Sequence, residues 1–379
     1  MGAAVGAGGL SGGGSAGGAP KDGLPAGTTT GIGSLPFVDV ARALDAAFEV
    51  DLPYVPQLPL RDPREFMLGQ ALEGLPGLVV DDQGGVVLDE PTWAAGAAAY
   101  GARLEAALAA LERVPPDAPV PADAAAFLPS ADAQACFAPF VARVAAGGVP
   151  RVKAQLAGPM TLEWTLRTPE GARPPLEART QLLRTVLVRA RVMIQALRAA
   201  GAEVTFFLDE PGLYVYARTR PEHVAMLEGL RVVVSALRRA GARVGLHCCS
   251  DADWGTFLDL GFDVLAFDVG LSLRSIVKAG DALVRHAQGG GRLALGLVPT
   301  TGRDARVDPR ALVDGLFAGV RAIEHHFPAR AAALQHVLAR GWITPACGLA
   351  FLDEADAARV PGELRAVQRE LAARVAAVG

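Results

Sequence analysis

The chain has 379 residues, of which 51% are hydrophobic and 20% charged, and its formal net charge at pH 7 is −4. This composition is typical of a globular protein that buries a sizeable core in one or two domains. The lysines and arginines are scattered along a net acidic chain, which excludes a nucleic acid or a membrane surface as the expected partner. No apolar stretch approaches the roughly 20 residues that span a bilayer. We therefore expect a soluble protein that binds a small molecule.

Residues 1–27 are rich in glycine, alanine and serine and lack the basic and apolar regions of a signal peptide. We expect them to be a disordered tail, because this composition buries too little surface to offset the entropy of ordering. Four cysteines in a long chain without a secretory signal indicate reduced thiols and a cytoplasmic location. Cys136, next to Phe137, is expected to serve packing.

Short apolar runs, most of them followed by a helix-like segment, recur after the tail. They cover residues 28–36, 50–59, 151–159, 203–211, 243–251, 263–270, 292–300 and 341–349. Near-continuous apolar strands that alternate with helices predict a parallel sheet, and eight of them predict an α/β fold of the (β/α)₈ TIM barrel type. A doubly wound sheet or two smaller domains are the alternatives. The lack of a Gly-x-Gly-x-x-Gly turn disfavours a dinucleotide-binding half.

The connection between the second and third runs is too long for one helix. Residues 78–150 contain a hairpin signal around Gly84 and then two alanine-rich helices. We expect an insertion that elaborates this connection, within a single catalytic domain over 28–379. The first connection, residues 37–50, fits one short helix.

Polar residues gather where the runs end, which in a barrel is the functional face. They are Gly33 and Ser34, Gln57, Gly158, Asp209 and Glu210, His247 to Cys249, Asp268, Thr300 and Thr301, and Cys347. The topology of a parallel barrel predicts that these side chains converge on one mouth.

The run RVGLHCCSD, residues 243–251, carries a histidine and two cysteines at its end. Alternation along a strand sends His247 and Cys249 to one face and Cys248 to the other. With Cys347 they form a set that suits tetrahedral zinc, the fourth position being left for substrate or for a carboxylate such as Asp268. Singly, each residue also fits packing or an ordinary hydrogen bond. The joint pattern favours a metal site.

Other residues at the mouth each have more than one interpretation. Only one of Asp209 and Glu210 can face the lumen, and the other is expected to meet a helix or a salt-bridge partner. A lumenal carboxylate could hold an ammonium group, act as a general base or be solvated. Gly33 and Ser34 could bind a carboxylate or form a plain turn. Trp164 could be a stacking wall or pack against helices.

The stretches TTTGIGSLP, LAGPMTLEWTLR, FLDEPGL, LHCCSD and TPACGL resemble, in the same order, the catalytic C-terminal barrel of cobalamin-independent methionine synthases. Their wider superfamily holds uroporphyrinogen decarboxylase and zinc methylcobamide methyltransferases. The resemblance covers residues 28–352. It implies zinc bound by His247, Cys249, Asp268 and Cys347, with Asp268 where the family usually has glutamate. The implied reaction is methyl transfer to a small thiol, with homocysteine as the leading acceptor and methionine as its product.

The resemblance also implies how the acceptor is held. Ile32, Gly33 and Ser34 would cradle the carboxylate of homocysteine, and Asp209 would take its amino group. Gln57 stands where the family has a carboxylate for the same amine, a change that would alter or loosen acceptor recognition.

Two departures from the family bear on the methyl donor. Full-length members have an N-terminal barrel that helps to bind a polyglutamylated folate. We expect no such second barrel in this chain. They also place an Asp–His pair after the seventh strand, where this sequence reads GLVPTTGRD. We therefore expect methylcobalamin or a methyl-corrinoid protein as donor rather than a folate. The alternatives are a uroporphyrinogen decarboxylase-like enzyme and a non-catalytic protein that docks a corrinoid carrier.

Overall fold

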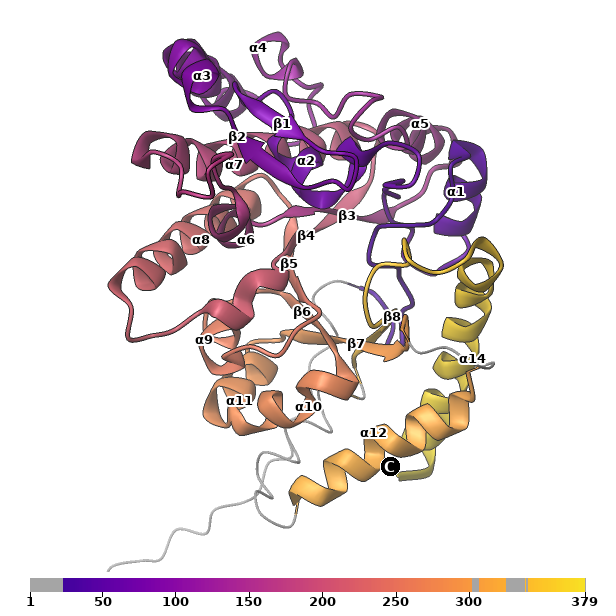
Figure 1. Ribbon diagram of the computed structural model, residues 1–379. Coiled ribbons are helices and arrows are strands. Elements are labelled where there is room, and N and C mark those ends of the chain that lie inside the picture. The colour runs from indigo at the N-terminus through magenta and orange to yellow at the C-terminus, as the bar shows by residue number, and fades with distance from the viewer. Residues whose placement is uncertain (1–22, 302–306, 325–337, 339, 379) are drawn as a thin grey trace, which may run out of the picture.

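A six-stranded parallel sheet forms the centre of the computed structural model, which describes residues 23–301, 307–324, 338 and 340–378 (Figure 1). Its strands follow one another in chain order: β3 (Arg151–Ala157), β4 (Glu203–Asp209), β5 (Arg243–Cys248), β6 (Val264–Asp268), β7 (Arg292–Val298) and β8 (Trp342–Pro345). Each strand coincides with one of the six later apolar runs. The expected α/β class with a parallel sheet is confirmed.

Helices connect these strands and pack against one face of the sheet, as expected for right-handed crossovers. They are α6 (Pro159–Thr165), α7 (Leu176–Ala199), η2 (Pro211–Val215), α8 (Pro221–Arg239), α9 (Trp254–Leu258), α10 (Val269–Lys278), α11 (Asp281–Gln288), α12 (Pro309–Glu324) and α14 (Glu354–Val378). None of the described helices is both long enough and apolar enough to cross a membrane.

The first two expected strands, residues 28–36 and 50–59, do not form regular strands, so the structure shows a six-stranded half-barrel instead of a complete eight-stranded barrel. They contribute isolated parallel bridges, namely Thr29 to Ile343, Ser34 to Gln57 and Tyr54 to Lys153. Prolines interrupt the second segment at positions 53 and 56, where no N–H is available for a ladder. In the first segment the glycines interrupt strand packing.

The expected tail is only partly within the described chain, because residues 1–22 lie outside it. Residues 23–27, which we expected to be disordered, are instead packed against the sheet. The Gly27 N–H donates to the Gly341 carbonyl at 2.7 Å, and Leu24 is buried. Leu24 and Gly27 thus have defined contacts with the rest of the fold.

The long connection contains the predicted hairpin, followed by three helices where two were predicted. β1 (Leu78–Val80) and β2 (Val86–Leu88) pair antiparallel around Gly84, whose φ of 76° suits a glycine in a tight turn. Helices α3 (Glu90–Glu112), α4 (Ala122–Ala125) and α5 (Phe137–Gly147) follow. The remaining helical elements are α1 (Val40–Ala47), η1 (Pro63–Glu65) and α2 (Met67–Leu72), and α1 is the short helix expected in the first connection.

The sheet has two apolar faces with separate cores. The large core lies between the sheet and its helices. A second, small core occupies the inner face and consists of Leu24, Leu52, Phe207, Val264, Ala266, Ala294 and Trp342. Its strand members stand at alternate positions, as period-two side-chain alternation requires. The same alternation places Lys153 and Gln155 on the inner face of β3, and Asp209 and His247 on the inner faces of β4 and β5.

Gly245→Ala should destabilise the protein, because Gly245 lies under the Phe207 ring on the inner face. An added Cβ would stand 2.6 Å from three ring carbons. We expect the free energy of unfolding to fall by about 1–3 kcal/mol in urea titrations. Gly362→Ala in α14, where an added Cβ meets no atom of the described residues within 4 Å, is the control and should raise the free energy of unfolding by about 0.5–1 kcal/mol. Equal destabilisation by both variants would contradict this packing.

Candidate metal centre

The ends of β5 and β8 converge on a group of three soft ligands. One ligand atom from each of His247, Cys249 and Cys347 lies within 4.8 Å of the other two. Strands β5 and β8 are three places apart in the sheet order, which in a flat sheet separates them by about 14 Å. The curvature of the sheet therefore closes this distance, and residues 98 positions apart in sequence meet at the strand ends.

The other cysteine of the pair faces away from this group. Cys248 is fully buried in the core between the sheet and its helices, and its sulfur lies 3.2 Å from the Ser250 hydroxyl. The alternation predicted from the sequence is thus present. Only one of the two adjacent thiols is available to a ligand on the inner face.

The Cys249 and Cys347 thiols influence each other strongly. A hydrogen bond from Cys249 lowers the pKa of Cys347, and His247 adds to this effect. The same hydrogen bond, together with burial, raises the pKa of Cys249. Of the two thiol protons, that of Cys347 is therefore lost more easily than that of Cys249. A divalent cation would favour the loss of both, since thiolates are its ligands.

These residues fit zinc by the chemistry of their donors and by their spacing. One imidazole and two sulfurs are the borderline-soft set that tetrahedral zinc prefers, and three protein ligands leave one position open. His247 is 4% exposed, and its buried Nδ1 atom has no hydrogen-bond partner among the residues that the structure describes. The other ring nitrogen, Nε2, is then the one that interacts with Cys347.

Asp268 lies next to this group but outside the set of mutually close atoms. It caps α10, accepting hydrogen bonds at Oδ1 from the N–H groups of Gly270 at 2.7 Å and Leu271 at 3.3 Å. Burial raises its pKa, and these N–H groups oppose the effect. Its role as a fourth ligand stays a prediction.

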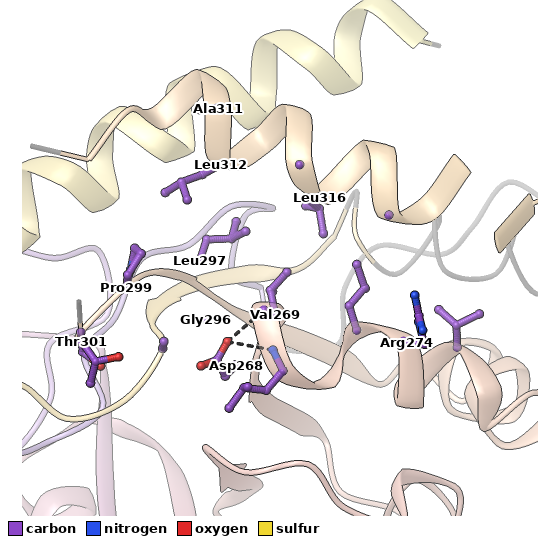
Figure 2. A pocket seen from close by; sticks show the side chains of 18 of the residues that line it. Asp268, Val269, Arg274, Gly296, Leu297, Pro299, Thr301, Ala311, Leu312 and Leu316 are labelled. Atoms are coloured by element: carbon purple, nitrogen blue, oxygen red, sulfur yellow. Dashed lines mark hydrogen bonds between the residues drawn. The ribbon is translucent and has the colours of Figure 1, made fainter. Parts of the chain in front are cut away.

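A cavity of about 1020 Å³ borders Asp268 between α10 and α12. Figure 2 shows Leu312 and Leu316 of α12 across the cavity from Asp268, with Arg274 farther along α10. Ala346, which precedes Cys347, also lines it. Its lining residues thus include Asp268 and Ala346 but not His247, Cys249 or Cys347.

The segment predicted to hold a carboxylate lies beside the same group. The Ser34 hydroxyl is so close to Gly348 that a Cβ added there would stand 2.0 Å from Oγ. The Ser34 carbonyl also accepts the Leu349 N–H at 2.8 Å. The buried Lys153 ammonium donates to the Ile32 carbonyl at 2.5 Å, which anchors the segment from below. Ile32 to Ser34 and Cys347 are thus brought together.

Gln57 lies under this segment and is already bonded. Its amide nitrogen donates to the Gln70 side chain. A Cβ on Gly33 would stand 2.7 Å from the Gln57 Oε1 and 2.6 Å from the Gln155 Nε2. Gly33 is therefore required for the close approach of this backbone to two amides.

Asp209 and Glu210 point in opposite directions, as expected. Glu210 is fully buried at the start of α6, where it accepts the N–H groups of Met160 at 3.0 Å and Thr161 at 2.6 Å. Asp209 is the residue on the inner face, and burial raises its pKa to about 6 while the Lys153 charge opposes this effect. Burial lowers the pKa of Lys153 to about 8, opposed by Asp209.

Trp164 stands on α6 and contacts the helical layer. Its ring packs edge-on against His223, with 5.3 Å between ring centroids, and lies over Gly212. This contact matches the packing interpretation of Trp164, and its role toward a substrate stays a prediction.

Lys153 and Gln155 were not predicted from the sequence to lie at the site. They stand two residues apart in the run RVKAQLAGP, which we treated as uniformly apolar. A charged residue and an amide at i and i+2 signal a polar inner face on that strand. Gln70, the partner of Gln57, has no such signal because it lies in a separate helix.

No protein-family model and no curated protein matches the chain. Among solved structures it is similar to a methyltransferase from Methanosarcina mazei, with 16% identity and a TM-score of 0.47 over 93% of this chain and 95% of that chain. It is also similar to a B12-independent methionine synthase from Shewanella sp. W3-18-1 in complex with selenomethionine. That match has 15% identity and a TM-score of 0.42 over 63% of this chain and 68% of that chain.

These neighbours include a methionine synthase and a methyltransferase, the kinds of protein that the sequence motifs resemble. Both identities and both TM-scores are low. We therefore transfer no residue role from either structure to this chain.

Thiol labelling should distinguish the metal-facing cysteines from the packed ones. In metal-free native protein at pH 8, a maleimide should label Cys347 fastest and Cys249 more slowly, because both are half-buried and the hydrogen bond between them lowers the pKa of Cys347 and raises that of Cys249. One equivalent of zinc should protect both. Cys136 and Cys248 should react only after denaturation, because both are buried and burial raises the pKa of Cys136 to about 12. Labelled sites would be counted by peptide mass spectrometry. Labelling of Cys248 in place of Cys249 would contradict the strand orientation.

Proposed function

We propose that this protein is a zinc-dependent methyltransferase that moves a methyl group to a small thiol, with homocysteine as acceptor and methionine as product. The observation that carries the proposal is the group formed by His247, Cys249 and Cys347, whose ligand atoms lie within 4.8 Å of one another. An open fourth position in such a set suits a thiol substrate. Asp268 is the residue that would complete the coordination when no substrate is bound.

We use the name metal group for His247, Cys249 and Cys347 together. The acceptor would lie between the metal group and residues 32–34. Ser34 packs against Gly348, the neighbour of Cys347, so a carboxylate held at this segment is close to the metal ligands. Asp209 would bind the amino group of the acceptor, since it is the carboxylate on the inner face of β4. Gln57 is neutral, so the negative charge that attracts this ammonium group would come from Asp209.

Bound zinc would lower the pKa of the acceptor thiol, so that a thiolate is present at neutral pH. The residues of this chain would orient that sulfur toward the donor and keep water away, because the inner-face core closes the lumen beneath it. In the transfer, a sulfur–carbon bond forms as the bond between the methyl group and the donor breaks. The thiol proton leaves when the acceptor binds.

A corrinoid is the donor that we favour, either methylcobalamin or a methyl-corrinoid protein. The sequence GLVPTTGRD offers no histidine to protonate a folate leaving group, which a corrinoid does not require. The cavity of about 1020 Å³ that Asp268 and Ala346 help to line is the space that we propose for a large donor.

We further propose that residues 28–379 act as one catalytic domain of the barrel type, with 78–150 as an insertion, and that it works in the cytoplasm. The bridges at Thr29, Ser34 and Tyr54 support a closed arrangement around the inner core. A uroporphyrinogen decarboxylase-like activity is the alternative enzyme. The group of soft ligands favours the methyltransferase, since that decarboxylase type needs no metal.

Cys347→Ser should abolish both zinc binding and methyl transfer. Protein purified without chelator should contain about one zinc per chain by elemental analysis, and Cys347→Ser should lose at least 100-fold in zinc affinity because a thiolate ligand is gone. Cys248→Ser is the matched control, since this thiol faces the helices, and it should retain zinc and activity. Assays would use homocysteine with methylcobalamin and with methyltetrahydrofolate in parallel. Zinc-free wild-type protein with full activity would overturn the proposal. Wild-type protein that transfers no methyl group but binds a corrinoid carrier as well as Cys347→Ser does would favour a protein that only docks the carrier.

Homocysteine binding should release about one proton at neutral pH, because the thiol would bind zinc as a thiolate. Isothermal titration calorimetry in two buffers of different ionisation enthalpy measures this number directly. Methionine, which has no thiol proton, is the control ligand. Equal proton release by both ligands would count against thiolate formation.

A further inference from the structure

Two buried polar atoms next to the metal group have no hydrogen-bond partner in the described chain. They are Oδ1 of Asp209 and Nδ1 of His247, in side chains that are 6% and 4% exposed. Buried donors and acceptors are nearly always paired, so each orphan atom calls for an explanation. Both stand beside a site suited to a metal ion.

Asp209 and His247 are register partners on neighbouring strands. β4 and β5 run parallel, with the Cα atoms of these two residues paired at the carboxyl ends. Alternation turns both side chains to the inner face, because Thr205 and Phe207 precede Asp209 on that face and Gly245 precedes His247. The carboxylate and the imidazole thus project side by side toward the same end of the lumen.

Lys153 supplies the positive charge that makes a buried carboxylate acceptable at this place. Its ammonium donates to the Gln155 side chain at 3.0 Å and to the Ile32 carbonyl, and it lies 4.9 Å from the centre of the Phe207 ring. Its charge and that of Asp209 attract each other within the buried layer. A negative Asp209 is therefore stabilised from below, while its Oδ1 stays without a donor.

We propose that Asp209 is a positioning residue for the metal centre, whose carboxylate accepts a hydrogen bond from the Nδ1–H of His247 when Nε2 of the same ring binds zinc. The inference rests on the proposed function for the presence of zinc. A metal-bound histidine almost always donates its other N–H to a carboxylate, a carbonyl or water, which fixes the ring and raises its basicity. The second oxygen of Asp209 stays available for the amino group of the acceptor.

Zinc affinity measures this role without recourse to activity. Metal-free wild-type protein and variants would be titrated with zinc in competition with a chromophoric chelator. We expect Asp209→Ala to weaken zinc binding about 10–100-fold. Asp209→Asn keeps the size of the side chain and one acceptor oxygen, so its loss should be smaller but measurable. Circular dichroism and Tm would establish that each variant is folded. If Asp209→Ala is unfolded, the zinc affinity of Asp209→Asn alone tests the inference.

Glu210→Gln is the matched control, because it removes the same charge from the adjacent residue, which caps α6 on the opposite face of β4. Its zinc affinity should stay within about threefold of wild type. Cobalt substitution gives an independent signal, since a reoriented imidazole should shift the visible absorption bands in Asp209→Asn and not in Glu210→Gln.

The contact of Asp209 with the amino group of the acceptor is measured separately. Homocysteine and 4-mercaptobutanoate differ only in the amino group, so the ratio of their KM values reports the amine contact and zinc affinity reports the histidine contact. Zinc binding by both folded Asp209 variants within about threefold of wild type would overturn the inference and leave the proposed function intact. Wild-type protein that binds no zinc would overturn both.

Discussion

The curvature of the parallel sheet is the constraint on which the candidate site depends. His247 and Cys249 belong to the end of β5, whereas Cys347 follows β8, three places away in the sheet. Only a sheet that bends around a narrow lumen brings their ligand atoms within 4.8 Å of one another. The inner core explains how narrow that lumen is. The small side chains of Ala266 and Ala294 lie on strands between those of Phe207 and Trp342, whose ring centroids are 6.3 Å apart, so the strands approach closely and still fill the space.

Polarity within the lumen is arranged in layers. The apolar inner core lies beneath, Lys153 and Gln155 occupy the inner face of β3, and Asp209 and His247 stand at the strand ends above. A buried cation and a buried carboxylate are costly alone and tolerable together. This pairing separates the metal group from the apolar interior and places charge where an ionic substrate would bind.

Period-two alternation and barrel topology were sufficient to predict the site from the sequence. They placed His247 and Cys249 on one face and Cys248 on the other, and they brought Cys347 to the same end of the sheet. They also predicted that one of Asp209 and Glu210 would face away from the lumen and meet a helix or a salt-bridge partner, and Glu210 meets the start of α6. Both rules concern the face of the strand to which a side chain points and the order of the strands in the sheet. Neither depends much on detailed packing.

Features that depend on partners distant in sequence could not be predicted in this way. Residues 28–36 and 50–59 read as strands, but prolines and glycines reduce them to isolated bridges. Leu24 belonged to a segment expected to be disordered, and it is held because Arg292 donates to its carbonyl at 2.6 Å. Lys153 was overlooked because its partners, Ile32 and Asp209, come from two other segments.

The contact between Ser34 and the segment after Cys347 joins an early part of the chain to a late one, as does the hydrogen bond from Thr30 to Ile343. During synthesis on the ribosome, His247 and Cys249 emerge well before Cys347 does. A nascent chain therefore presents two of the three candidate donors without the third. A metal ion bound as we propose would have its full set of ligands only after β8 has docked.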